Sequence, residues 1–159
     1  MRVRRFLWIA VPLVALFLDL ASKAWIKHHV LTGWTRPVIP GFFNLVLTTN
    51  PGAIFGTMGG APPMVRHILF LVGGLAALGY FGWEFIKDGT PPVQRLGLGF
   101  ILGGAMGNGI DRLWHGSVVD FLDFILFGWH YWTFNIADSF IVVGAILIGL
   151  SFLSSLRRD

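Results

Sequence analysis

Four long apolar stretches dominate this sequence and limit the folds that it can adopt. They run over residues 6–26, 67–86, 93–110 and 134–156. A helix that crosses a membrane needs about 20 mostly apolar residues, and each stretch meets or approaches that length. Only 13% of the residues are charged, well below the share of about 25% in a typical soluble domain. The sequence therefore predicts an all-α membrane protein with four transmembrane helices, folded as one domain over residues 1–159.

The first stretch follows three arginines, as the apolar core of a signal peptide would. It is longer than such a core, lacks a convincing Ala-x-Ala cleavage site and contains Asp19 and Lys23. We therefore expect a retained helix. Four crossings place both termini on one side, and seven of the twelve Lys and Arg residues fall on that side. The positive-inside rule then predicts cytoplasmic termini.

The two longer connections, about residues 28–64 and 112–133, should accordingly face outward. The first contains turn residues and the β-branched run 43–49, which predicts a small strand or hairpin between the first two helices. The second is rich in Trp, Tyr and Phe, which favour the membrane–water interface. We expect this aromatic loop to lie along the outer membrane surface.

Composition excludes several classes of site. The chain has no cysteine, so it forms no disulfide, thiolate nucleophile or cysteine-ligated metal centre. Its net charge of +4 is spread over several segments rather than gathered in one stripe, so we expect no nucleic-acid partner.

Five of the eight acidic residues should gather at the outer membrane face. These five are Asp19, Asp111, Asp120, Asp123 and Asp138. Ionisable residues within membrane spans usually face the bundle interior and are candidates for function. Asp19 and Lys23 are spaced i, i+4 and suit an ion pair. Asp111 and Arg112 are adjacent, so each should pair with another group, within a structural network or on a substrate.

Asp120 and Asp138 differ from the others because apolar residues surround both and no cation lies near either in sequence. Burial raises the pKa of a carboxylate, and a second carboxylate close by raises one of the pair further. Two such groups sharing one proton can act as acid and base in peptide hydrolysis, as in aspartic proteases. A purely structural pair of hydrogen-bonded buried acids is the alternative.

Five motifs then identify a family. They are LDLASK (18–23), TTNPGAIFG (48–56), GGAMGNGIDR (103–112), GSVVDFLDF (116–124) and FNIADS (134–139). In this order, over nearly the whole chain, they resemble the lipoprotein signal peptidases (signal peptidase II). The resemblance implies an intramembrane aspartic endopeptidase of the bacterial inner membrane, without metal or other cofactor. Such an enzyme removes the signal peptide from diacylglyceryl-modified prolipoproteins, cutting before the lipid-modified Cys.

The resemblance also implies roles for individual residues. Asp120 and Asp138 match the catalytic pair, near the outer face. Positions that match the substrate pocket are Asn50, Gly52, Gly104, Asn108, Arg112, Val118 and Asn135. Structural support is expected from Asp19, Lys23 and Asp111. The implied partners are lipid-modified prolipoproteins and membrane lipids, and the protein is expected to be a monomer.

Three features leave questions open. Pro51 and Gly109 depart from the family pattern, and Pro51 removes a backbone donor from its loop. Asp123 rivals Asp120 for the catalytic pair, and the two would share a face if their segment were helical. Asp120 is favoured because it carries the GxVVD match.

Two other functions are compatible with parts of the sequence. Ser22 and Lys23 could form a serine–lysine nucleophile, although adjacent residues on a helix point about 100° apart. Aspartates among membrane helices could also relay protons or bind a transported ion. That reading is disfavoured because the acids cluster at one face while the middle of each span is uncharged.

Overall fold

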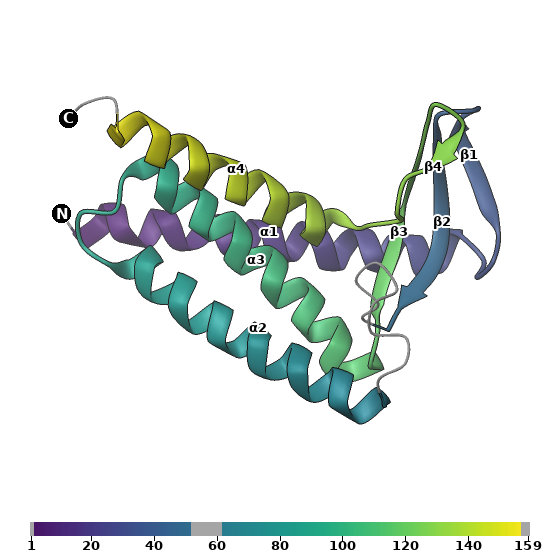
Figure 1. Ribbon diagram of the computed structural model, residues 1–159, viewed down its shortest axis with the longest axis horizontal. Helices are drawn as coiled ribbons and strands as arrows, with labels where there is room; N and C mark the ends of the chain where they lie inside the picture. Colours follow the sequence, from purple (N-terminus) through teal and green to yellow (C-terminus); the bar gives the residue numbers. More distant parts are fainter. Residues whose placement is uncertain (1, 52–61, 157–159) are drawn as a thin grey trace.

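The computed structural model describes residues 2–51 and 62–156 as a mostly helical chain with one small sheet (Figure 1). In chain order the elements are α1 (Arg2–His29), β1 (Thr35–Ile39), β2 (Phe43–Asn50), α2 (Pro63–Ile86), α3 (Pro92–His115), β3 (Val118–Leu126), β4 (Trp129–His130) and α4 (Ile136–Leu156). Both α2 and α3 begin at a proline, whose missing N–H is unneeded in the first helical turn. Helix α3 ends at His115, and the next residue, Gly116, caps it in a left-handed conformation with φ of 70°.

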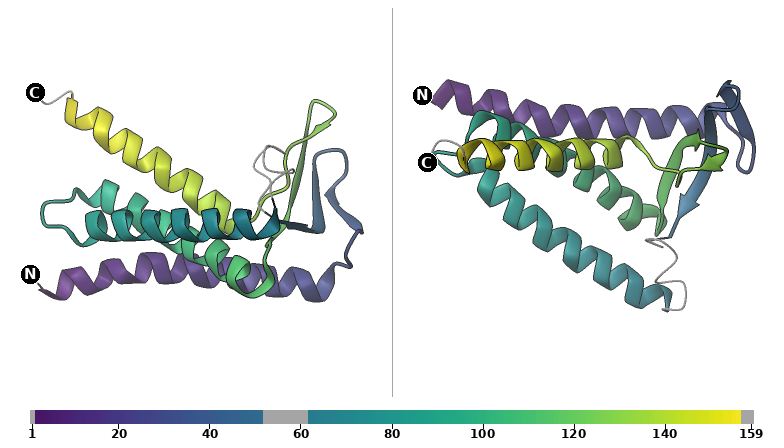
Figure 2. Two further views of the ribbon diagram at one scale, coloured as in Figure 1. Left: turned by 60° about the horizontal axis from the view of Figure 1, so that its bottom comes forward. Right: turned by 45° about the horizontal axis from the view of Figure 1, so that its top comes forward.

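Helix α3 is the central element and packs against α1, α2 and α4. The first turns of α1 and the last turns of α4 lie at one end of the bundle, and the sheet crosses the other end (Figures 1 and 2). Helix α2 packs on α3 and diverges from α1 toward the sheet (Figure 2). Helix α4, in turn, diverges from α1 toward the termini (Figure 2, left), so the helices are splayed rather than parallel.

Two rows of glycine let α3 approach its neighbours closely. The row that faces α1 consists of Gly99, Gly103 and Gly107, and the row that faces α4 consists of Gly97 and Gly104. A Cβ atom added to Gly104 would lie 2.4 Å from the carbonyl oxygen of Ala137, a distance at which the helices would have to separate. Small residues at such contacts are a common means of packing membrane helices. The glycine pair of α2 at positions 73 and 74, by contrast, has open space around it.

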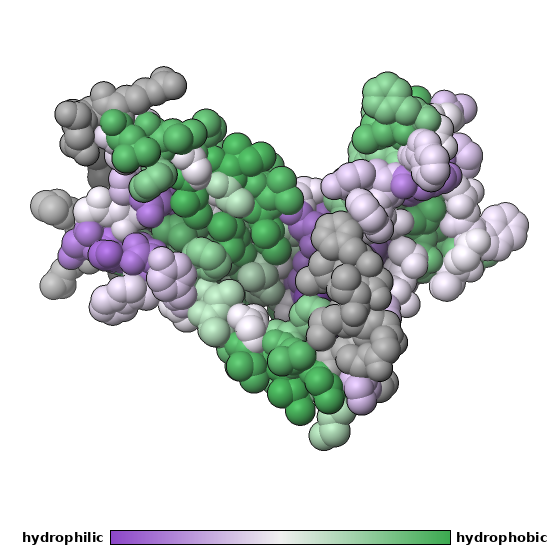
Figure 3. Space-filling model, viewed as in Figure 1, coloured by the Kyte–Doolittle hydropathy of each residue, from purple (hydrophilic) through white to green (hydrophobic). Residues whose placement is uncertain are grey.

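Within residues 2–51 and 62–156, three helices are long and apolar enough to cross a membrane: residues Leu7–His29, Ile68–Ile86 and Ile136–Leu156. Three of the four expected spans are thus confirmed by length and composition. The fourth, α3, has 24 residues but combines six glycines with polar side chains such as Asn108 and Asp111, which lower its apolar character. Apolar residues cover the sides of the helices, and hydrophilic residues gather in the hollow between helices and sheet (Figure 3).

The sheet corrects one prediction. Its strands are antiparallel in the order β1-β2-β3-β4, so both connections contribute to it, not only the one between the first two helices. The strand expected at residues 43–49 is confirmed as β2, but the aromatic connection is not a simple surface loop. Its run of β-branched and aromatic residues pairs with β2 because β2 would otherwise expose an unpaired edge.

Candidate active site

Asp120 and Asp138 reach the site from two different elements. Asp120 lies on β3, where its side chain is buried, and Asp138 lies in the first turn of α4. The N–H of Asp138 donates to Oδ1 of Asn135 (3.0 Å), and the N–H of Asn135 donates back to Oδ2 of Asp138 (3.3 Å). This reciprocal pair is a capping box, which satisfies N–H groups at the start of a helix. The cap of α4 therefore fixes the orientation of the Asp138 carboxylate.

Asn135 also connects the two aspartates. Its side chain is fully buried, and its Nδ2 donates to Oδ1 of Asp120 at 2.8 Å. The same amide nitrogen lies 3.1 Å from Oδ1 of Asn108 and 3.2 Å from the carbonyl oxygen of Val119. One residue thus binds Asp120 through its side-chain nitrogen and Asp138 through its side-chain oxygen and backbone.

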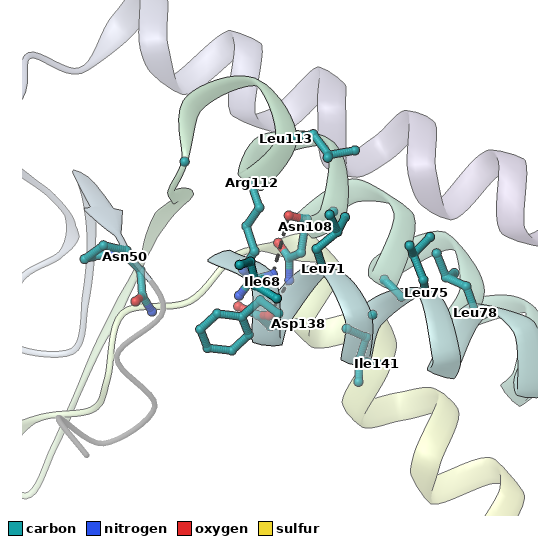
Figure 4. Close-up of a pocket in the computed structure, with 16 residues that line it drawn as sticks. Asn50, Ile68, Leu71, Leu75, Leu78, Asn108, Arg112, Leu113, Asp138 and Ile141 are labelled. Carbon is teal, nitrogen blue, oxygen red and sulfur yellow. Dashed lines mark hydrogen bonds between the residues drawn. The ribbon is translucent and has the colours of Figure 1, made fainter. Parts of the chain in front are cut away.

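Asn108 supplies a second donor to the pair from α3. Its Nδ2 donates to Oδ1 of Asp138 at 2.7 Å (Figure 4). Asp138 therefore accepts hydrogen bonds on both carboxylate oxygens, from Asn108 and from the backbone of Asn135. Such N–H donors suit an ionised carboxylate.

The two aspartates also interact electrostatically. The pKa of Asp120 is raised from 3.8 to about 6, mainly by burial and next by the negative charge of Asp138. Hydrogen bonds from the side chains of Asn135 and Asn50 oppose the rise, as does the positive charge of Lys23. The pair can therefore retain one proton at pH values where an ordinary aspartate is fully ionised.

A cavity of about 600 Å³ opens beside Asp138. One wall is apolar and comes mainly from α2, through Ile68, Leu71, Leu75 and Leu78, with Ile141 of α4 (Figure 4). The polar lining is formed by Asn50, Asn108, Arg112 and Asp138. The cavity therefore offers polar groups at the aspartate pair and an apolar surface along α2.

Arg112 brings a positive charge to this cavity. Its guanidinium lies 4.9 Å from the centre of the Phe70 ring and its Nη1 donates to the carbonyl oxygen of Asn108 at 3.4 Å. Stacking on an aromatic ring and a backbone contact together orient the side chain. Arg112 therefore lines the cavity, and its contact with substrate stays a prediction.

The remaining predicted pocket residues divide into groups. Asn50 ends β2 opposite Val118 in the register of the sheet and lines the cavity, while Val118 is buried. Gly104 is packed against Ala137 between α3 and α4. Gly52 lies outside the described residues. The structure therefore gathers Asn50, Asn108, Arg112 and Asn135 around the aspartates and assigns Gly104 a packing position.

The expected ion pair of Asp19 and Lys23 is present, with 2.7 Å between Oδ2 and Nζ. Lys23 also lies 2.9 Å from Oδ2 of Asp111, which answers the question of where Asp111 finds its partner. Ser22 donates its hydroxyl to the carbonyl oxygen of Asp19, not to the lysine amine. The arrangement disfavours a serine–lysine nucleophile because the ammonium is buried among carboxylate partners.

Asp123 occupies a separate polar cluster. Its segment is a strand rather than a helix, so residues three apart point to opposite faces. Nδ2 of Asn44 donates to Oδ2 of Asp123 at 2.8 Å, and Nδ1 of His130 lies 2.8 Å from Oδ1. Sequence reasoning missed both partners, and the only signal for Asn44 was its place on the expected strand. The rival carboxylate thus has its own hydrogen-bond partners.

Comparison with known proteins agrees with this geometry. A model of the family described as signal peptidase (SPase) II matches residues 11–154. The lipoprotein signal peptidase of Serratia proteamaculans is 42% identical over 98% of this chain and 90% of its own length. That of Chromobacterium violaceum is 40% identical over 89% of this chain and 87% of its own.

Solved structures extend the similarity to the fold. Two structures of bacterial membrane enzymes, obtained by the in meso method, superpose with TM-scores of 0.84 and 0.80 at 31% and 32% sequence identity. They cover 96% and 92% of this chain, and the match spans 90% and 92% of theirs. The resemblance seen in the motifs is thereby confirmed, and the chain belongs to the signal peptidase II family of peptidases.

Proposed function

We propose that this protein is an intramembrane aspartic endopeptidase that removes the signal peptide from diacylglyceryl-modified prolipoproteins, cutting before the lipid-modified Cys. The observation that carries the proposal is the pairing of Asp120 and Asp138 through Asn135, beside a cavity with one apolar wall. The relatives at about 40% identity are lipoprotein signal peptidases, which supports the choice of substrate.

The hydrogen bonds suggest how the two aspartates divide the work. Asp138 accepts hydrogen bonds from two N–H groups and acts as the base. It takes a proton from a water molecule while the oxygen of that water attacks the scissile carbonyl carbon. Asp120 holds the other proton and hydrogen-bonds the carbonyl oxygen, where negative charge develops. When the C–N bond breaks, the proton on Asp138 passes to the leaving amine, and the released acid and amine complete the hydrolysis.

The cavity suits a substrate that is part peptide and part lipid. Its apolar α2 wall would contact acyl chains, and Asn108 and Arg112 would orient the peptide and the glyceride esters. Because α2, α3 and α4 all line the cavity, we expect the lipid to reach it between membrane helices. The aspartates lie at the sheet end of the bundle, far from the terminal turns of α1 and α4 (Figure 1).

This arrangement supports a membrane topology. The family and three apolar helices indicate a multi-pass membrane protein. Helix α3 is covered by α1, α2 and α4, so it needs less apolar surface of its own and would form the fourth crossing. The proposed placement has cytoplasmic termini, an active site at the outer face of the bacterial inner membrane, and a monomeric single domain over residues 1–159.

The test is cleavage of a lipid-modified prolipoprotein in detergent by the purified protein, beside Asp120→Asn and Asp138→Asn. Wild type should release the signal peptide, and each variant should lose at least about 1,000-fold in rate, within the range for losing acid–base catalysis. The same prolipoprotein without its lipid should be a poor substrate. Turnover retained by either folded variant would sink the assignment of the catalytic pair.

A further inference from the structure

Lys23 is a buried cation at the centre of a polar cluster. Its Nζ lies 2.7 Å from Asp19, 2.9 Å from Asp111 and 3.1 Å from Oδ1 of Asn108. A lysine ammonium has three N–H donors, so each has one acceptor here. We call Asp19, Lys23, Asn108 and Asp111 the Lys23 cluster; all four are at least 95% buried.

The two carboxylates of the Lys23 cluster each hold a backbone group next to the active site. Oδ1 of Asp19 accepts a hydrogen bond from the N–H of Ala137 at 2.9 Å. Oδ2 of Asp111 accepts one from the N–H of Val119 at 3.1 Å. Ala137 immediately precedes Asp138, and Val119 immediately precedes Asp120. The two bonds therefore hold the backbone at the residue that precedes each of the two proposed catalytic side chains.

The third hydrogen bond of Lys23 acts on Asp138 through the side chain of Asn108. Because the ammonium donates to Oδ1 of Asn108, the Nδ2 of that amide is turned toward Asp138. An inverted amide would place its nitrogen against the ammonium and its oxygen against the carboxylate, which are both unfavourable. Lys23, together with Nδ2 of Asn135 on the same oxygen, thus determines which end of Asn108 faces Asp138.

We propose that Lys23 is a positioning residue that sets the spacing and orientation of Asp120 and Asp138 through these three connections. The inference rests on the proposed peptidase function for its catalytic consequence. Its physical basis is that the buried ammonium holds two like charges, Asp19 and Asp111, in fixed places. Without it the carboxylates repel each other or take up protons, and their backbone partners shift. A displacement of about 1 Å in an active site can cost about 100-fold in rate.

The experiment compares Lys23→Met with Lys27→Met. Methionine keeps the length of the side chain but removes the charge, and Lys27 is an exposed residue one turn further along α1. The expected result for Lys23→Met is a kcat lower by about 100-fold with KM within about 3-fold. Amide hydrogen exchange should also become faster at Val119 and Ala137. Lys27→Met should match wild type in rate and in exchange.

A second variant guards against a failure to fold. Lys23→Met combined with Asp111→Asn restores the net charge of the Lys23 cluster, and it should fold yet keep the low kcat because Asn108 still lacks its lysine donor. Wild-type kcat in a folded variant without Lys23 would overturn the inference. A low kcat with unchanged exchange at both amides would overturn it too. If wild type itself cleaves no prolipoprotein, the proposed function fails, and the exchange measurements alone decide whether Lys23 positions the two segments.

Discussion

Asp120 and Asp123 lie three residues apart on one strand, and both are almost completely buried. Asp123 binds Asn44 and His130, so both of its oxygens have donors from neighbouring strands of the sheet. Asp120 binds Asn135, and it faces the charge of a second carboxylate, Asp138. The two carboxylates differ in their partners: Asp123 is stabilised by hydrogen-bond donors, whereas Asp120 lies near the like charge of Asp138. Burial alone therefore does not distinguish the two aspartates; what distinguishes Asp120 is a second carboxylate nearby, with no lysine or arginine bound between the two as Lys23 is between Asp19 and Asp111.

Substituting each aspartate in turn is the strongest way to break this comparison. Asp120→Asn should abolish cleavage, whereas Asp123→Asn should keep the rate within about 10-fold and lower the free energy of unfolding by about 2 kcal/mol, since it weakens bonds to a buried charge. Prolipoprotein cleavage and thermal unfolding in detergent measure the two effects. Equal loss of activity in two folded variants would place Asp123 in the mechanism.

The same contrast can be tested on the asparagines that bind the two aspartates, Asn135 and Asn44. Asn135→Ala removes the donor to Asp120 and the cap of α4, so we expect a rate lower by about 100-fold and a loss of about 2 kcal/mol in stability. Asn44→Ala removes the donor to Asp123 and should cost similar stability with nearly unchanged rate. Comparable cleavage rates for the two variants would contradict the separation of Asp120 and Asn135 from Asp123 and Asn44.

The pH dependence of stability should follow Asp120. Its pKa is about 6 in the folded protein against 3.8 ordinarily, so between those values the folded state binds more protons than the unfolded state. Stability should therefore be highest below about pH 4 for this group and fall as pH rises to about 6, by about 3 kcal/mol in total. Asp120→Asn should remove this slope when unfolding is measured across that range.

The same titration tests the origin of the shift. Burial is the larger cause and the charge of Asp138 the next, so Asp138→Asn should lower the pKa of Asp120 without restoring it to 3.8. Carbon-13 NMR of labelled aspartate would follow the carboxyl group directly. A pKa unchanged by Asp138→Asn would mean that the two carboxylates do not interact.

The smallest effect is expected at His130, the more exposed of the two residues that bind Asp123. The side chain of His130 is 64% exposed, so water screens its interaction with Asp123. His130→Ala should change the free energy of unfolding by less than about 1 kcal/mol and leave cleavage unchanged. A larger loss in thermal unfolding would show that His130 holds the β3–β4 hairpin more firmly than its exposure suggests.

Local patterns in the sequence predicted a large part of this molecule. Runs of apolar residues identified three membrane helices, and the β-branched run at 43–49 identified β2. Asp120 and Asp138 were noticeable because each interrupts an apolar segment. The i, i+4 spacing of Asp19 and Lys23 was sufficient to expect their ion pair, since both lie on one helix.

Features that depend on distant partners were not predictable in this way. Asn44 and Asp123 are 79 residues apart, and Lys23 and Asn108 are 85 apart, so no spacing rule relates them. The strand β3 was read as a surface loop because its pairing with β2 is set by the fold. Helix α3 was the least apolar of the four expected spans, because its three neighbouring helices cover polar residues such as Asn108 and Asp111 that would be costly against lipid.

The capping box of α4 has a consequence for the order in which the site assembles. Asp138 is oriented by bonds to Asn135, three residues away, so its carboxylate can be in place once the first turn of α4 forms. Asp120 depends on β3 pairing with β2, whose residues are some 70 positions earlier in the chain. Closing a long loop costs more entropy and takes longer than closing a short one. We therefore expect the cap to preorient Asp138 early in folding, before Asn108 of α3 binds it, and the peptidase to gain activity only when the sheet is complete.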